Sequence, residues 1–331
     1  MTQRPQVVIT DSDLASTADE RVLRAAGLDA VRLAARTEDD LIAALARTRA
    51  DALIVQWAPV TGAVLDAAPG CRFISRLGIG VDMIDVEAAT ERGVAVANTP
   101  DYCVAEVAAH TLAMALWLLR GLGRYDAAVR SGQWAVAGPS PAPARPSATT
   151  IGVVGLGRIG TRVADQARAL GFRVLGCDPY IAPPPRLRLV TFEELLRASD
   201  LVTLHAPLSG ETSHLIRADT IALMRTGAML VNTCRGGLID EAAVAEAVRS
   251  GQLAGAALDV FETEPLPDGS ALRSLPNVLL TPHAAWYSAA SLAELPVRAA
   301  QQVVDFLAGV PVPSIVNPAY LDHAAARGTR V

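Results

Sequence analysis

The sequence predicts an α/β protein built from two doubly wound parallel sheets. Short apolar runs alternate with helical segments along most of the chain, which is typical of strand–helix–strand units. The apolar runs are rich in Val, Leu and Ile, as expected for strands that are covered on both faces. With 331 residues, of which 51% are hydrophobic, the chain is long enough to bury the cores of two domains.

The first alternating series occupies the N-terminal part of the chain. Its apolar runs are "QVVIT", "DAVRL", "DALIVQW" and "RFISRLG", with helices expected near 16–26, 38–48 and 61–68. After "GVAVANTP" the chain enters an apolar helix that we expect to continue to about Trp134. The segment "AVAGPSPAPARPSAT" (135–149) has Pro and Ala without periodicity and predicts a surface loop.

A second series follows, with seven apolar runs and helices between them. The runs are "TIGVVG", "RVLGCD", "RLVT", "DLVTLHAP", "AMLVNTC", "GAALDVF" and "NVLLTPH". They predict a second doubly wound sheet. The last helix, "SLAELPVRAAQQVVDFLAG", and "PVPSIVNP" come after this series.

The composition disfavours several classes of function. The net charge of -5 gives no general attraction to nucleic acid or to anionic membranes. The four cysteines show no CxxC spacing, so we expect neither a disulfide framework nor a metal site, and a reducing cytoplasm fits. The apolar run "VAAHTLAMALWLL" is interrupted by His110 and is too short to cross a bilayer.

A glycine-rich turn indicates a dinucleotide site. Gly155, Gly157 and Gly160 have GxGxxG spacing, after a predicted strand and at the head of a helix, where backbone N–H groups can bind a pyrophosphate. Asp178 ends the next strand, where a carboxylate can accept hydrogen bonds from ribose hydroxyls and would repel a 2'-phosphate. The pattern therefore favours NAD over NADP, and the alternative is a glycine turn that binds no ligand.

Three further polar residues follow predicted strands, at the edge where open parallel sheets bind ligands. They are Arg235, Glu264 and His283. Singly, each has a structural interpretation: a loop residue, an exposed turn carboxylate and a packed histidine. Together they supply an anion clamp, a carboxylate and an acid/base, which are the groups needed to reduce a 2-keto acid.

Several motifs of the chain resemble those of a known family. "VGLGRIG", "VNTCRGGLIDEAAVAEAVRSGQLAGAALDVFETEPLP" and "LLTPHAAWYS" look like the D-2-hydroxyacid dehydrogenase family, and "PHAAWYS" with "SRLGIGVDMID" is most similar to its C-terminal-binding-protein-like branch. The resemblance implies a discontinuous substrate-binding domain of flavodoxin-like type, residues 1–100 and 290–331, and an inserted NAD-binding Rossmann domain, residues 101–289. It also implies that Arg235, Glu264 and His283 are the catalytic residues.

Elementary chemistry agrees with these roles. A protonated His283 would donate to the developing alkoxide, Glu264 would hold its imidazole in one tautomer, and Arg235 would grip the substrate carboxylate or keto oxygen.

The resemblance also assigns residues that would contact the substrate and the cofactor. Arg76 matches a substrate-facing arginine, the alternative being a sheet-end residue paired with an acid, and the N–H groups of Leu77 and Gly78 match a carboxylate-binding loop. Trp286 would line the substrate pocket, or else pack in a core; an aromatic wall favours an apolar or thioether side chain on the substrate. Expected cofactor contacts are Gly155, Gly157, Arg158, Ile159, Gly160, Asp178, His205, Ala206, Pro207, Thr212, Thr233, Cys234, Asp259 and Val104.

The preferred hypothesis is a cytoplasmic NAD-dependent oxidoreductase that interconverts a small 2-keto acid and a D-2-hydroxy acid. One alternative is an NAD(H)-sensing, corepressor-like binding protein; against it, the chain ends soon after "VNPAY" and contains no nucleic-acid element. Another is a dehydrogenase for formate or phosphite. The apolar helix from about 104 to 120 predicts a homodimer.

Overall fold

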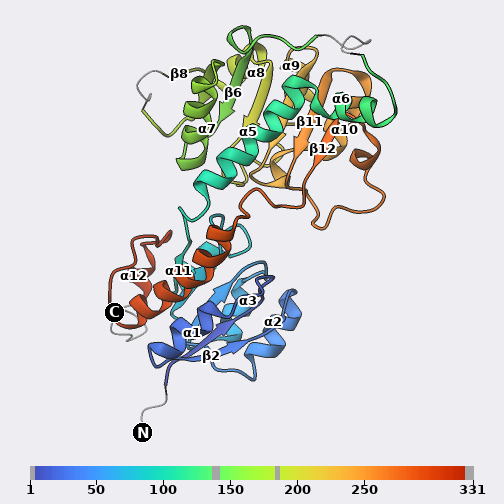
Figure 1. The fold of residues 1–331 in the computed structure, drawn as a ribbon. Helices are drawn as coiled ribbons and strands as arrows, with labels where there is room; N and C mark the ends of the chain where they lie inside the picture. The colour runs from blue at the N-terminus through green and yellow to red at the C-terminus, as the bar shows by residue number, and fades with distance from the viewer. Residues whose placement is uncertain (1–3, 136–141, 183–186, 325–331) are drawn as a thin grey trace. The chain divides into compact units, whose positions relative to one another are not determined.

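A computed structural model describes residues 4–135, 142–182 and 187–324 of the chain. The protein forms two compact units, of which one is Met1–Tyr102 with Ser288–Val331 and the other is Cys103–Tyr287. Each unit contains a parallel sheet with helices on both faces, so the predicted fold class is confirmed (Figure 1).

The sheet of the first unit has five parallel strands in the order β2-β1-β3-β4-β5. The strands are β1 (Gln6–Ile9), β2 (Asp29–Arg32), β3 (Ala52–Val55), β4 (Phe73–Arg76) and β5 (Ala95–Ala97). This is the flavodoxin-like order, whose direction of winding reverses between β1 and β3.

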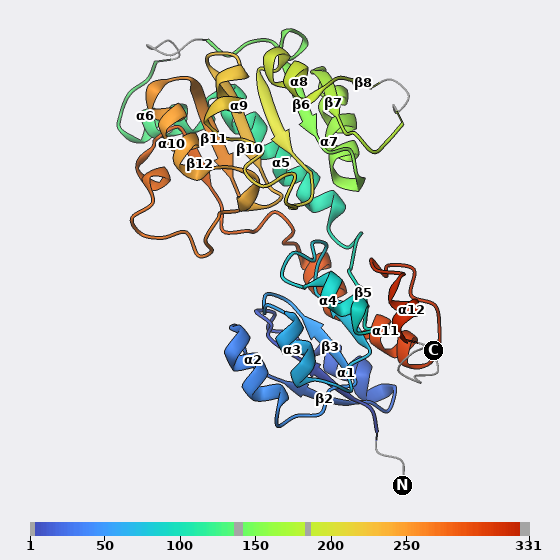
Figure 2. The same cartoon turned by 180° about the vertical axis from the view of Figure 1, so that it is seen from behind.

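Helices from both ends of the sequence cover this sheet. They are α1 (Ala18–Ala25), α2 (Glu38–Leu45), α3 (Gly62–Ala67), α4 (Val86–Glu91), α11 (Ala289–Leu307) and α12 (Tyr320–Ala324). Leu41, Val64 and Ala89 place α2, α3 and α4 in one buried core with the sheet, while α1 and α11 pack together and α11 also contacts β4 (Figure 2). On the α11 side, Phe306 stacks on Phe73 of β4 with ring centroids 4.5 Å apart. The short helices α4 and α12 were not predicted.

The second unit has seven parallel strands in the order β12-β11-β10-β9-β6-β7-β8. The strands are β6 (Thr150–Val154), β7 (Arg173–Cys177), β8 (Arg188–Leu189), β9 (Leu201–Leu204), β10 (Ala228–Asn232), β11 (Leu253–Leu258) and β12 (Val278–Leu280). All seven predicted runs form strands. Their order is that of a dinucleotide-binding sheet with one added strand, and it reverses between β6 and β9.

Two hydrophobic cores lie on the two faces of this sheet. On one face are α5 (Val104–Arg120) and α7 (Arg158–Ala169); on the other are α8 (Phe192–Ala198), α9 (Ala218–Leu223) and α10 (Glu241–Ser250). Short 3₁₀ turns, η1 (Pro146–Ala148), η2 (Gly236–Leu238) and η3 (Ala271–Ser274), lie between these elements.

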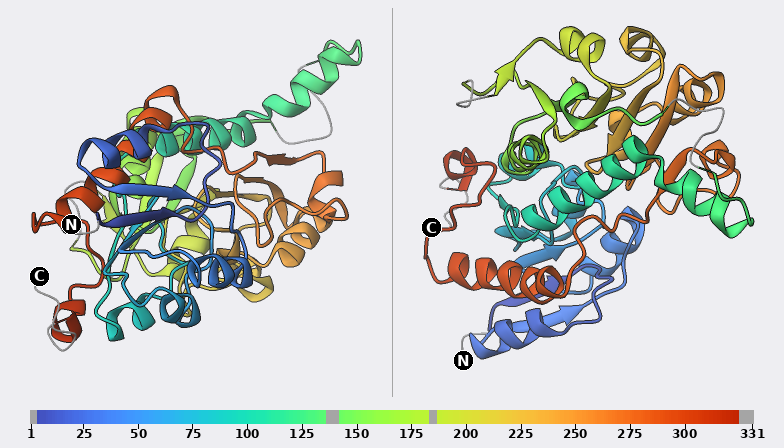
Figure 3. Two further views of the ribbon diagram at one scale, coloured as in Figure 1. Left: turned by 90° about the horizontal axis from the view of Figure 1, so that it is seen from below. Right: turned by 45° about the horizontal axis from the view of Figure 1, so that its top comes forward.

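The prediction that the apolar helix continues to Trp134 was wrong. Helix α5 ends at Arg120, and Gly121 adopts a left-handed φ of 62°, which glycine takes without a steric penalty. A second helix, α6 (Leu122–Arg130), then leaves in another direction and extends away from its own sheet (Figure 3). Of the loop predicted over 135–149, residues 136–141 lie outside the described part of the chain.

In the described ranges, no helix has both the length and the apolar character needed to cross a membrane.

Candidate active site

The glycine-rich turn after β6 packs tightly against the loop after β9. Gly155 has a φ of 85°, and a Cβ there would lie 2.6 Å from the backbone of His205. A Cβ on Gly160 would lie 2.0 Å from the carbonyl oxygen of Gly155. Packing within the unit therefore requires both of these glycines.

Neither packing within the chain nor the backbone angle requires a glycine at position 157. Nothing lies within 4 Å of the position that its Cβ would take, and its φ is -66°, which any residue can adopt. It is the N-cap of α7, and no side chain caps this helix, whereas Thr191 caps α8 and Asp240 caps α10. The open space and the uncapped N–H groups of Arg158 and Ile159 fit the close approach of a pyrophosphate.

Asp178 lies against the same turn. Its Oδ2 accepts a hydrogen bond from the N–H of Leu156 at 2.8 Å, and its Oδ1 accepts one from the N–H of Tyr180 at 2.9 Å. A second carboxylate is close by, because the hydroxyl of Tyr180 donates to Glu211 at 3.1 Å. The hydrogen bond to Glu211 raises the pKa of Tyr180. Two acidic groups at this edge oppose binding of a 2'-phosphate.

Most of the other predicted cofactor residues follow the strands of the seven-stranded sheet at its carboxyl edge. His205, Ala206 and Pro207 follow β9, and Thr233 and Cys234 follow β10. Hydrogen bonds organise these loops: Cys234 Sγ donates to the carbonyl of Ala206 at 3.0 Å, and Thr212 Oγ1 donates to the carbonyl of Pro207 at 2.6 Å.

Two of the predicted cofactor residues, His205 and Val104, differ from the others in burial or position. Burial lowers the pKa of His205 to about 3, so its imidazole is neutral near pH 7. Val104, by contrast, begins α5 and does not follow a strand.

His283 and Glu264 form the central contact of the site. His283 Nδ1 donates to Glu264 Oε2 at 2.7 Å, and Glu264 Oε1 accepts a hydrogen bond from the N–H of Phe261 at 3.0 Å. Burial alone would raise the pKa of Glu264, but the bond and charge of His283, the Phe261 N–H and the Arg235 charge together lower it. The carboxylate therefore stays ionised near neutral pH and fixes which ring nitrogen of His283 carries a proton.

The backbone at His283 is strained and is held in place by Asp259. His283 has a φ of 52°, in the left-handed region that few side chains adopt, and its N–H donates to the carbonyl of Asp259 at 2.7 Å. The carboxylate of Asp259 is fully buried and accepts hydrogen bonds from the N–H groups of Ala284 and Ala285, both at 2.9 Å, and from the hydroxyl of Thr281. Asp259, which the resemblance assigns to the cofactor contacts, thus holds the turn that carries His283.

His110 and Thr281 extend this cluster and were missed from the sequence. Because Thr281 Oγ1 donates to Asp259, it accepts from His110 Nε2, 3.2 Å away. His110 Nε2 lies 3.8 Å from Asp259 Oδ1. The available signal was a histidine interrupting an apolar helix, but its partners are far away in the sequence.

Arg235 lies on the neighbouring loop, after β10. Its Nη1 donates to the carbonyl of Cys234 at 2.7 Å, and its own carbonyl accepts from Asn232 Nδ2 at 2.7 Å. A Cβ on Gly236 would lie 1.9 Å from the backbone carbon of Phe261, so this loop packs on the segment that leads to Glu264. The second unit therefore brings Arg235, Glu264 and His283 together at one edge of its sheet.

The predicted substrate residues Arg76, Leu77 and Gly78 belong to the first unit. Arg76 ends β4 with 5% of its surface exposed; its Nη1 donates to the carbonyl of Leu77 at 2.8 Å, and its guanidinium lies 5.7 Å from the ring centre of Trp57. The N–H of Leu77 donates to Val55 and that of Gly78 to the carbonyl of Arg76. A substrate carboxylate would have to share these two donors, so their role stays a prediction.

Trp286 is half-buried and packs edge-on against Tyr287, with ring centroids 5.6 Å apart. Tyr287 is 61% exposed, so this aromatic pair lies at the surface of its unit. Its place in a substrate pocket stays a prediction.

Comparisons with known proteins agree with this geometry. Residues 112–285 match the family model described as the D-isomer specific 2-hydroxyacid dehydrogenase NAD binding domain. The chain is 42% identical over 277 residues to the D-3-phosphoglycerate dehydrogenase of Mycobacterium leprae, a match that covers 81% of this chain and 51% of that protein. The chain thus spans about half the length of this curated relative.

Solved structures extend the similarity to both units. A protein of Thermus thermophilus superposes with a TM-score of 0.83 at 35% identity, covering 94% of this chain and 99% of the other. The D-lactate dehydrogenase of Aquifex aeolicus, solved with NAD and lactic acid, gives a TM-score of 0.82 at 29% identity, covering 92% and 96%.

Proposed function

The chain belongs to the D-isomer specific 2-hydroxyacid dehydrogenase family, and we propose that it is an NAD-dependent oxidoreductase interconverting a small 2-keto acid and the D-2-hydroxy acid. The observation that carries the proposal is the 2.7 Å hydrogen bond between His283 and Glu264, with Arg235 on the adjoining loop. The C-terminal-binding-protein-like branch suggested by the sequence is not needed for it.

The residues that would hold NAD are those of the glycine turn. The N–H groups at the start of α7 would bind the pyrophosphate, Gly157 would leave room for it, and Asp178 would accept the ribose hydroxyls. The carboxylates of Asp178 and Glu211 favour NAD over NADP. When bound, this cofactor supplies or accepts the hydride.

His283 is proposed as the general acid and base. Glu264 engages Nδ1, so the proton that is exchanged with the substrate belongs to Nε2. In reduction Nε2 donates a proton to the oxygen of the former keto group, and in oxidation it takes the hydroxyl proton. The ionised Glu264 stabilises the imidazolium form that this exchange requires.

Arg235 is proposed as the anion clamp. Its planar guanidinium binds a carboxylate or polarises a keto oxygen, and such a fork orients the carbonyl carbon as well as attracting the anion. Its bond to the Cys234 carbonyl and the packing of Gly236 on Phe261 fix the loop that carries it.

The substrate side chain is the finer part of the proposal. The aromatic pair at Trp286 favours an apolar or thioether side chain, whereas the relative named above acts, by its name, on D-3-phosphoglycerate. A panel of 2-keto acids that varies side-chain size and charge, with 3-phosphohydroxypyruvate included, separates the two possibilities. NADH oxidation is the readout.

The acid/base role is tested by two substitutions of His283. We expect His283→Ala and His283→Asn each to lower kcat on the best substrate by about a thousandfold, with NADH affinity within about twofold of wild type. His283→Asn is the matched variant, because asparagine tolerates the left-handed backbone and preserves the turn. Normal turnover by either variant would contradict the assignment.

Two other outcomes would favour the alternatives. No turnover on the whole panel, together with stable capture of a peptide-motif partner, would indicate a corepressor-like binding protein. Turnover only of formate or phosphite would keep the family but change the chemistry.

We also propose that the chain forms a homodimer through α5 and α6. Helix α6 has no buried residue, and it exposes Leu122 (49%) and Val129 (53%), with Trp134 (90%) just beyond it. Exposed apolar side chains gathered on one projecting helix are typical of an interface. Light scattering should give a dimer mass that falls to the monomer mass in a Leu122→Glu, Val129→Glu double variant; a concentration-independent monomer would rule the dimer out.

A further inference from the structure

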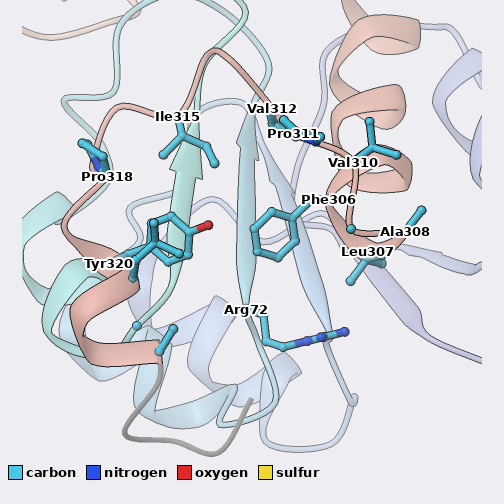
Figure 4. Close-up of a pocket in the computed structure, with 14 residues that line it drawn as sticks. Arg72, Phe306, Leu307, Ala308, Val310, Pro311, Val312, Ile315, Pro318 and Tyr320 are labelled. Carbon is cyan, nitrogen blue, oxygen red and sulfur yellow. The ribbon is translucent and has the colours of Figure 1, made fainter. Parts of the chain in front are cut away.

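The first unit contains a cavity that the proposed reaction does not use. It lies between the C-terminal end of α11, the segment that follows it, and α12 (Figure 4), and its volume is about 540 Å³. Its walls are mostly apolar, with Phe306, Val310, Val312, Ile315 and Pro318 among them. Cavities of about 300–1,000 Å³ with apolar walls and a few polar groups are typical of small-molecule sites.

The first polar group of the cavity is the hydroxyl of Tyr320. This side chain is only 5% exposed, and within residues 4–135, 142–182 and 187–324 its hydroxyl has no hydrogen-bond partner. Figure 4 shows the hydroxyl directed across the cavity, on the side of Phe306. Burial raises the pKa of Tyr320, so the hydroxyl keeps its proton. The hydroxyl faces the open space of the cavity, where an oxygen of a ligand can accept its hydrogen bond.

The second polar residue of the lining is Arg72, and Figure 4 shows its guanidinium below Leu307, directed away from Tyr320. Arg72 is half-buried and directly precedes β4, and in the described part of the chain its side chain forms no hydrogen bond or ion pair. Most arginines of this unit, such as Arg32 and Arg92, are paired with acids. A planar cation at an apolar cavity favours a carboxylate among small anions.

The cavity is separate from the residues assigned to the reaction. Arg72 and Gly93 precede β4 and β5, so they lie at the amino edge of the sheet, whereas Arg76 ends β4 at the carboxyl edge. A molecule in this cavity would therefore not compete with one at Arg76.

We propose that this cavity binds a small amphipathic carboxylate. Its apolar or aromatic body lies against Phe306 and Ile315, its carboxylate pairs with Arg72, and one of its oxygens accepts a hydrogen bond from Tyr320. The proposal is independent of the dehydrogenase activity.

The test uses the full chain with saturating NAD, which keeps the probe out of the dinucleotide site. The probe is 1-anilinonaphthalene-8-sulfonate, an aromatic anion whose fluorescence rises in apolar sites, and the competitors are 4-phenylbutyrate and the uncharged 4-phenylbutan-1-ol. On the wild-type protein we expect the acid to displace the probe at about a tenfold lower concentration than the alcohol, because only the acid pairs with Arg72.

Substitutions of single side chains show which of them causes the difference between the acid and the alcohol. Arg72→Gln should weaken the acid about tenfold and leave the alcohol unchanged, and Tyr320→Phe, which keeps the ring, should weaken the acid about threefold. Val310→Trp, at a half-exposed wall position, should abolish displaceable binding by filling the cavity. The matched controls Arg47→Gln, an exposed arginine of the same unit, and Tyr125→Phe, a tyrosine of the other unit, should behave as wild type.

Several results would overturn the proposal. These are equal displacement by acid and alcohol, no displacement by either, an unchanged acid affinity in Arg72→Gln, or wild-type binding in Val310→Trp. Thermal melting of every variant shows whether it is folded, and Tyr320→Phe carries the test if another variant is not. Activity is not a readout, so a failure here leaves the proposed function untouched.

Discussion

The two sheets have the same kind of topology, but the points at which their strand order reverses are built differently. Between β6 and β9, the glycine turn leaves an open space at Gly157 and an uncapped helix start. Between β1 and β3, the carboxylate of Asp11, 1% exposed, accepts hydrogen bonds from the N–H groups of Gln56 at 3.1 Å and Trp57 at 2.7 Å. In the second unit the backbone N–H groups at the reversal point are left for a ligand. In the first unit the N–H groups of Gln56 and Trp57 are already bonded to the carboxylate of Asp11.

The comparison shows that topology alone does not make a binding site. Open parallel sheets tend to bind ligands where the strand order reverses, because backbone donors and helix N-termini gather there. In the first unit no glycine follows β1, and residues 10–17 separate β1 from α1, whereas only residues 155–157 separate β6 from α7. What matters is whether the chain leaves those donors unsatisfied.

The largest effect is expected from removing the internal acceptor of the first unit. Asp11→Ala leaves two buried N–H groups without their acceptor and should lower the free energy of unfolding by about 3 kcal/mol, or the Tm by about 6–12 °C. Asp11→Asn keeps one acceptor oxygen and should lose about half as much. NADH affinity of the folded protein should not change, and an unchanged Tm in Asp11→Ala would remove the basis of the comparison.

The next largest effect is expected from substitutions of Gly157, which faces open space, and Gly160, which packs against Gly155. Gly157→Ala adds a methyl group in empty space, so the Tm should stay within about 2 °C of wild type while the Kd for NADH rises at least tenfold, roughly 1.4 kcal/mol. Gly160→Ala instead meets the Gly155 carbonyl and should lower the Tm, at a cost of about 1–3 kcal/mol. Calorimetric titration and thermal melting give both quantities, and equal behaviour of the two variants would argue against an open site at Gly157.

A smaller effect concerns the turn that carries His283. Thr281→Val removes the hydroxyl between His110 and Asp259 without changing the side-chain shape, and we expect kcat to fall about tenfold with little change in KM. Thr226→Val, at an exposed threonine of the same unit, is the matched control. If KM rose and kcat did not fall, Thr281 would act on substrate binding and not on the position of His283.

The smallest effect is the pH dependence of Glu264. A carboxyl group whose pKa is lowered in the folded state stabilises that state above its unfolded pKa, and this stabilisation is lost as the pH falls through the folded pKa. The Tm difference between wild type and Glu264→Gln should therefore be constant from neutral pH down to about 4.5. Below that it should shrink, by no more than about 2 °C in all. A difference that grew on acidification would reverse the sign of the pKa shift.

The sequence predicted the parts of the molecule that depend on local pattern. The alternation of apolar runs and helices gave both sheets, and the GxGxxG spacing placed Gly155, Gly157 and Gly160 at the turn after β6. Because the ends of parallel strands share one edge, the positions of Arg235, Glu264 and His283 after their strands also predicted that they would meet.

The remaining features depend on contacts between distant residues or on a backbone angle. His110 meets Thr281 across 171 residues, and Asp11 meets Gln56 across 45, so neither partner is visible from a local pattern. The left-handed φ at Gly121 and at His283 had no distinguishing sequence signal, since a glycine within a helical pattern can also continue the helix and histidine is rarely strained. Arg72 and Tyr320 line one cavity although they lie far apart in the sequence, so no local pattern predicts it.

The discontinuity of the first unit has a consequence for synthesis on the ribosome. The strands β1 to β5 emerge first, but α11, which packs on α1 and stacks Phe306 on Phe73, is translated only after the whole second unit. At about 5–20 residues per second, one face of the early sheet would wait on the order of 10–40 s for its cover. The second unit, contiguous in sequence, can complete its fold in that interval, whereas the part of the N-terminal sheet that α11 covers stays exposed until α11 is made.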